Sequence, residues 1–97
     1  MPYIVQDRRP TYDYATTEIS DALNACQDMT TAAGEANYAI TRILDAWLGS
    51  KPRYWMFCMA CGTLVCVLLE LYRRRIGPYE NEAISKNGDC YTGVPTQ

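Results

Sequence analysis

Apolar residues recur at helical spacing along most of the chain, and this pattern predicts an all-α fold. A first apolar stripe predicts a helix over residues 16–29, and a second predicts a helix over residues 35–48. The two stripes consist of Ile19, Ala22, Leu23, Cys26 and Met29, and of Ala36, Ile40, Ile43, Leu44 and Trp47. Residues 30–34 read as a linker, because two threonines and a glycine favour a helix less than their neighbours.

The longest apolar run predicts a third helix over residues 52–76. Pro52 suits its first turn, and Gly77-Pro78 is expected to end it. Sixteen residues, 54–69, carry no formal charge, so this helix is apolar all the way round and must be enclosed by protein or by lipid. The uncharged run rises about 24 Å, less than the ~30 Å hydrocarbon core of a bilayer. A single membrane span therefore remains an alternative, and a central helix of a homo-oligomer is the prediction.

The two ends of the chain give weaker patterns. Residues 1–12 contain two prolines and are expected to form an extended arm. Residues 78–97 are expected to form a short helix followed by a loose tail. The sequence thus predicts a single helical domain over residues 1–97, a small bundle of three main helices that assembles with copies of itself.

Composition excludes much chemistry. The chain has 97 residues, 48% of them hydrophobic, which is too short for a two-domain enzyme and too apolar for a disordered chain. It contains no histidine, the usual general base and metal ligand, and no glycine-rich phosphate loop. Cys58 and Cys61 form a C-x-x-C pair, but nothing completes a zinc site around them. We therefore expect no catalysis, no metal and no cofactor.

The absence of a signal peptide at Met1 leads us to expect a cytoplasmic protein with reduced thiols.

Charge is distributed unevenly, and this points to an anion site. Residues 1–50 carry a net −4, residues 51–76 a net +4 and residues 77–97 a net −2, for a total of −2. The total gives no reason to expect binding to double-stranded nucleic acid. Arginines beside tyrosines suit a phosphorylated ligand, because guanidinium binds phosphate through two hydrogen bonds and tyrosine stacks on a base. The candidate ligand-binding residues are Arg73, Arg74, Tyr72, Arg8, Tyr38 and Arg42. In the alternative interpretation, Glu70 pairs with Arg73 or Arg74 and the other side chains are simply solvated.

Five short motifs follow one another in a recognisable order. They are Met1-Pro-Tyr-Ile4, Gly34-Glu-Ala-Asn-Tyr-Ala-Ile-Thr41, Glu70-Leu-Tyr-Arg-Arg74, Pro78-Tyr-Glu80 and Asn87-Gly-Asp89. The chain resembles a family of roughly hundred-residue uncharacterised proteins from phage and prokaryotic genomes. Members of that family carry a Glu near Val65 and a Lys near Leu68, where this chain is apolar. The resemblance implies a phage or prokaryotic origin and brings no activity with it.

Two classes of function are compatible with these patterns. One is a small helical oligomer that holds a nucleotide-like ligand between its subunits. In size and general form it is similar to phage proteins that sequester nucleotide signals of host immunity, and this is an analogy. The other is a protein-interaction module that uses the apolar third helix and binds no small ligand.

Overall fold

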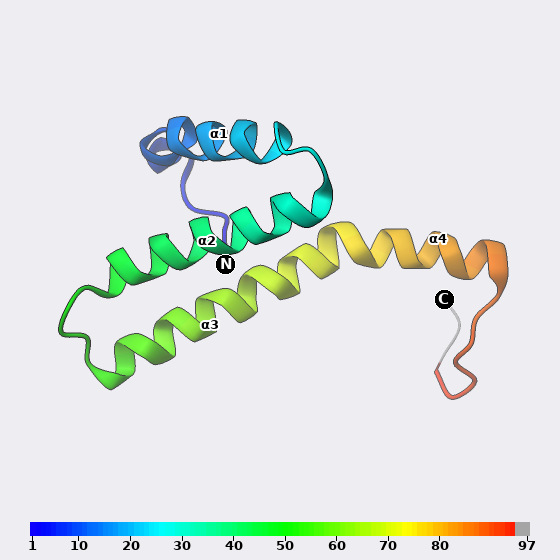
Figure 1. Ribbon diagram of the computed structural model, residues 1–97. Helices are drawn as coiled ribbons and strands as arrows, with labels where there is room; N and C mark the ends of the chain where they lie inside the picture. Colours follow the sequence, from blue (N-terminus) through cyan, green and yellow to red (C-terminus); the bar gives the residue numbers. More distant parts are fainter. Residues whose placement is uncertain (95–97) are drawn as a thin grey trace. The chain divides into compact units, whose positions relative to one another are not determined.

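The computed structural model describes residues 1–94, and every regular element among them is a helix (Figure 1), which confirms the all-α prediction. The chain divides into two compact units, residues 2–62 and the residues from 63 onward together with Met1. One helix, α3 (Tyr54–Leu71), contributes its first half to one unit and its second half to the other. That residues 1–97 form one domain and that copies associate both stay predictions.

The N-terminal segment is helical sooner than its prolines indicated. A 3₁₀ turn, η1 (Gln6–Arg8), precedes α1 (Pro10–Asn24), so the predicted extended arm over residues 1–12 and the predicted helix start at residue 16 were wrong. The reason is that proline in the first helical turn loses no hydrogen bond and already has a helical φ. The Arg9 Nε also donates to the carbonyl of Ile4 at 3.0 Å, which folds the first residues back onto this turn.

The second helix, α2 (Met29–Leu48), begins six residues before its predicted start. Asp28 caps it: an Asp28 carboxylate oxygen accepts the backbone N–H of Thr31 at 2.7 Å, and this satisfies one of the amides left without a partner at a helix start. The predicted linker over residues 30–34 was therefore wrong, as was the extension of the first helix to residue 29. The cap outweighs the modest helix propensity of the threonines and Gly34.

The helices α1 and α2 lie side by side (Figure 1). Ile19 and Leu23 on α1 are half-buried, as are Ala32, Ala36 and Ala39 on α2. The alanines lie at spacings of four and three residues, so they form one stripe, and their small side chains let the two helices approach closely. The pair buries one side of each helix without enclosing any of its residues completely.

Between α2 and α3 the chain reverses over five residues. Gly49 takes φ +75°, a conformation that other residues adopt at a cost, and its N–H donates to the Asp45 carbonyl at 3.1 Å. Pro52 precedes α3, which then runs for 18 residues, or about 27 Å at 1.5 Å per residue.

The predicted stop at Gly77-Pro78 was wrong, because the helical backbone passes through it. A π-helical turn, η2 (Tyr72–Ile76), joins α3 to α4 (Gly77–Asn87), and Gly77 has a helical φ of −54°. In this turn the Gly77 N–H donates to the Tyr72 carbonyl five residues back. Pro78 has no N–H and its ring clashes with the carbonyl four residues earlier, and a widened turn relieves that clash.

Residues 77–87 confirm the predicted short C-terminal helix. Gly88, at φ +89°, ends it, and the Tyr91 N–H then donates to the Asp89 carboxylate at 2.8 Å. The remaining part of the predicted tail, residues 95–97, lies outside the described residues.

Candidate functional site

The six predicted ligand-binding residues fall into two groups. Tyr72, Arg73 and Arg74 share the π turn η2. Arg8 lies on η1, whereas Tyr38 and Arg42 lie four residues apart on α2 and are exposed. The first group belongs to the unit from residue 63 onward and the second to residues 2–62. Neither unit by itself therefore gathers all six side chains.

Arg73 is held by a carboxylate of its own helix. Its Nε and Nη2 donate to the two oxygens of Glu70, at 3.0 and 2.9 Å. The Arg73 side chain is 62% exposed and that of Glu70 is 26% exposed, so the pair is well formed but largely in contact with solvent. The pairing of Glu70 with Arg73 was one of the two interpretations that the sequence allowed. An anion that binds Arg73 has to compete with this carboxylate.

The π turn gives the three consecutive arginines, Arg73 to Arg75, an unusual backbone. Its ring is wider than an α-helical turn, and single π turns occur frequently at functional sites. Gly77 closes the turn tightly: a Cβ built on it meets the Tyr72 carbonyl oxygen at 3.2 Å. The cationic turn, which we define as Tyr72 to Arg75, is thus fixed by a glycine and a proline that follow it.

The second candidate surface is α3 itself. Among the described residues of the chain, Ala60 is the only buried one, at 5% exposure. Val67, Leu68 and Leu69 are consecutive and each is more than half exposed. Since successive helical residues point about 100° apart, these three alone present apolar groups to most of the circumference. We call the following exposed side chains the α3 apolar surface: Tyr54, Trp55, Phe57, Met59, Leu64, Val65, Val67, Leu68, Leu69 and Leu71.

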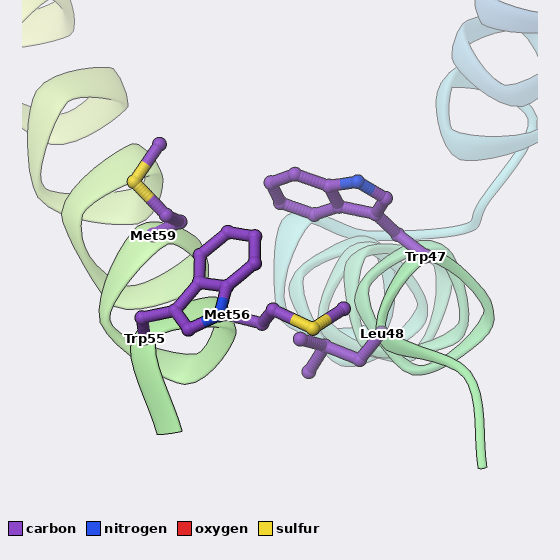
Figure 2. A pocket seen from close by; sticks show the side chains of 5 residues that line it. All are labelled: Trp47, Leu48, Trp55, Met56 and Met59. Atoms are coloured by element: carbon purple, nitrogen blue, oxygen red, sulfur yellow. The ribbon is translucent and has the colours of Figure 1, made fainter. Parts of the chain in front are cut away.

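A pocket lies where the end of α2 meets the start of α3, within residues 2–62. Trp47 and Leu48 line it from α2, and Trp55, Met56 and Met59 line it from α3 (Figure 2). Its volume is about 150 Å³ and its walls are almost entirely apolar. Met56 is positioned by its own backbone turn, since its sulfur accepts the Arg53 N–H at 3.3 Å.

All five cysteines have free thiols. Cys58, Cys61 and Cys66 lie exposed on α3, and Cys26 is half-buried near the end of α1. Partial burial raises the pKa of the Cys26 thiol, and a hydrogen bond to Glu35 together with its negative charge raises it further. Within residues 1–94, no three Cys, Asp or Glu side chains are close enough together to hold a metal ion.

Sequence reasoning missed the pocket. The sequence feature that could have predicted the pocket is a tryptophan followed by an apolar residue, which occurs twice. Trp47-Leu48 precedes the short Gly/Pro-containing connection, and Trp55-Met56 follows it. A short connection makes consecutive helices antiparallel neighbours, so apolar pairs that flank it converge.

Fold and surfaces together define a small all-helical protein that leaves one long helix apolar and open. Residues 1–90 match the family described as a domain of unknown function, DUF6899, and the chain belongs to that family. No curated protein matches the chain, and no solved structure does.

Proposed function

We propose that the protein is a small self-associating binding protein in which α3 helices of several copies cover one another. The α3 apolar surface carries this proposal, because a helix that is apolar on all sides is stable in water only when it is enclosed. On α1 and α2 the half-buried stripes face each other, and the exposed apolar residues of α2, such as Ile40, Ile43 and Trp47, are fewer than those of α3.

Two features of α3 support a second copy of the same chain as its cover. The absence of a side chain at Gly62 allows a close helix crossing, and a Cβ placed there meets no atom within 4 Å. The charges also favour like chains as partners, because residues 1–50 carry a net −4 and residues 51–76 a net +4. Copies of such a chain attract one another when opposite segments face each other.

The proposed ligand is a phosphorylated, nucleotide-like anion held at the cationic turn. Three consecutive arginines concentrate positive charge on one turn, and this charge attracts an anion. Tyr72 adds a ring on which a base can stack. The resemblance to phage and prokaryotic proteins supports a cytoplasmic role in a prokaryotic cell, where the protein sequesters a nucleotide-derived signal and thereby counters host defence.

Sedimentation and native mass spectrometry test the assembly, and a melting-temperature screen tests the ligand. The screen uses cyclic dinucleotides, cyclic trinucleotides, ADP-ribose derivatives and mononucleotides. A ligand at 100 times its dissociation constant contributes about 2.7 kcal/mol to stability, which is easily detected. A compact monomer at micromolar concentration contradicts the assembly. If no compound raises the melting temperature, the protein is an interaction module without a small ligand.

Variants of the cationic turn sharpen the ligand test. Arg74→Ala should weaken binding of any hit, while Lys86→Ala, which removes the cation of the exposed Lys86–Glu82 pair at 3.5 Å, serves as the control. Glu70→Gln should strengthen binding about two- to fivefold, because it removes the carboxylate that competes for Arg73. An unchanged affinity in both Arg74→Ala and Glu70→Gln places the ligand elsewhere.

The length of the helix favours a membrane span as a second candidate. The continuous helical stretch Tyr54–Asn87 is long and apolar enough to cross a membrane, a property that core helices of soluble proteins share. From Arg53 to Arg73 the rise is about 30 Å, the thickness of the hydrocarbon core, and aromatic side chains stand near both ends. If the protein expressed in bacteria stays with the membrane after an alkaline carbonate wash, the span replaces the oligomer as the proposed cover of α3.

A further inference from the structure

The pocket between α2 and α3 has room for a single apolar group. Its volume of about 150 Å³ equals that of a cavity that holds one benzene molecule. The two indole rings, Trp47 and Trp55, come from different helices and flank the hollow, and Met59 lies at its edge (Figure 2). Both methionines in the wall are flexible, so they can adjust to the shape of a guest.

Charge next to the pocket selects the guest further. Two tryptophan rings can bind a quaternary ammonium ion through cation–π contacts. However, no carboxylate lines the pocket to balance the charge of such a ligand. The connection between α2 and α3, which adjoins the pocket in the sequence, instead carries two cations, Lys51 and Arg53, and within residues 1–94 neither forms an ion pair. The main chain of Arg53 is held beside the pocket wall, because its backbone N–H donates to the Met56 sulfur at 3.3 Å. A positive ligand is thus disfavoured and a negative one is favoured.

We propose that this pocket binds a small anionic amphiphile, a single aromatic ring or short acyl chain that carries one carboxylate, sulfonate or phosphate. The apolar part fills the space between Trp47 and Trp55, and the anionic end points to Lys51 and Arg53. This site is separate from the cationic turn and does not depend on the ligand proposed there.

Tryptophan fluorescence reads the site directly, because Trp47 and Trp55 are the only two tryptophans of the chain. The full-length protein is titrated with three probes that share a phenyl ring: 3-phenylpropionate, 3-phenylpropanol and phenethyltrimethylammonium. We expect saturable changes in emission with the anion bound most tightly, the alcohol more weakly and the cation most weakly. The reverse order, or no saturable change with any probe, overturns the proposal.

Three variants separate the contribution of the cations from that of the apolar wall. Lys51→Ala and Arg53→Ala should each weaken 3-phenylpropionate about two- to fivefold and leave 3-phenylpropanol unchanged. Leu48→Glu should abolish binding of both the acid and the alcohol, because it places a charge in the apolar wall. Ile40→Glu, two helical turns earlier on an exposed part of α2, is the matched control and should bind as the unmodified chain does. Circular dichroism confirms that each variant keeps its helices.

Measurement against protein concentration distinguishes this site from the proposed assembly. If a second copy fills the pocket, tryptophan emission changes with protein concentration and the probes have no effect, which overturns the pocket proposal and supports assembly. If the probes bind while the protein sediments as a monomer, the pocket proposal stands and the assembly fails.

Discussion

The helices α2 and α3 are of similar length, 20 and 18 residues, but they differ in how their apolar residues are distributed and buried. On α2 the half-buried alanines form one stripe toward α1, and the exposed residues are mixed, with polar ones such as Asn37 and Thr41 beside Ile40 and Ile43. On α3 the exposed residues are apolar on every side. The helix α2 packs its stripe on α1 within the chain, whereas α3 leaves apolar residues exposed on every side in the described part of the chain.

The largest expected effect comes from placing a charge on α3. Leu68→Glu puts a carboxylate on the α3 apolar surface, where assembly would bury it without a partner. An unpaired buried charge costs about 3–5 kcal/mol, or roughly two to four orders of magnitude in the association constant. Sedimentation velocity should therefore show the variant as a monomer at concentrations where the unmodified chain assembles.

The matched control lies on α2. Thr41→Glu adds the same charge to a helix of similar length at a residue that is already exposed, and it should leave the sedimentation coefficient unchanged. If both variants assemble alike, α3 is not the interface. If both dissociate, the interface includes the polar side of α2, and the contrast between the two helices is not what governs assembly.

The cysteines give a second measure of the same contrast. Cys58, Cys61 and Cys66 lie on α3, and Cys90 lies beyond α4. Covering α3 should slow alkylation of the three α3 thiols at least tenfold relative to Cys90, because alkylation needs access to each thiol. Mass spectrometry of peptides after timed exposure to iodoacetamide gives the four rates. Equal rates in the assembled protein would mean that α3 stays exposed.

Cys26 provides the internal comparison in the α1–α2 pair. Its raised thiol pKa lowers the reactive thiolate fraction in the folded chain, so it should react more slowly than Cys90 whatever the assembly state. Dilution to the monomer should speed the three α3 thiols and leave Cys26 as slow as before.

The existence of each helix was predictable from the sequence, but their ends were not. Apolar periodicity revealed α2, while residues 30–34 were assigned to a linker because Thr30, Thr31 and Gly34 are poor helix formers. The hydrogen bond from the Thr31 N–H to the Asp28 carboxylate decides where the helix starts. The sequence alone does not show whether an aspartate caps a helix or only faces solvent. Gly77-Pro78 misled for a similar reason, since the pair that usually ends a helix also suits the first turn of the next one.

The candidate site was predictable only within single elements. The cluster of arginines in the cationic turn and the pairing of Arg73 with Glu70 follow from spacing along one helix. The pocket does not, because Trp47 and Trp55 belong to different helices and only the geometry of the connection brings them together. Spacing along a helix also gave no indication of the π turn, which arises from the missing N–H of Pro78.

A third prediction concerns how the two helices end, since Gly49 stops α2 and Gly77 does not stop α3. Pro78→Ala restores an N–H and removes the ring, so the π turn should relax into a regular α-helix. In that background Gly77→Ala should add up to about 1 kcal/mol of stability through its helix propensity. With Pro78 present the same change should add less or destabilise, because its Cβ meets the Tyr72 carbonyl oxygen at 3.2 Å. Thermal melts of the four chains measure this coupling, and strictly additive effects contradict it.

The smallest expected effect concerns how α2 begins. The Thr31 N–H bond lowers the pKa of the Asp28 carboxyl, because it stabilises the ionised form that caps the helix. A lowered pKa means that this contribution is complete above the unfolded pKa of about 4 and is lost as the pH falls through the folded value. Asp28→Asn keeps an oxygen acceptor without the charge and should lose that acid dependence. Asp28→Ala removes the cap and should lower the melting temperature by a few degrees at neutral pH.

Circular dichroism at 222 nm between about pH 5 and pH 2 measures the difference between the unmodified chain and Asp28→Asn, so that other titrating carboxylates cancel. Asp21→Ala, on the exposed side of α1, is the control for the loss of one carboxylate and should leave the melting temperature at neutral pH nearly unchanged. If Asp28→Asn and the unmodified chain lose helix in parallel as the pH falls, the charge at Asp28 contributes nothing. The packing of α2 on α1 would then be sufficient to start the helix, and the contrast with α3 would rest on burial alone.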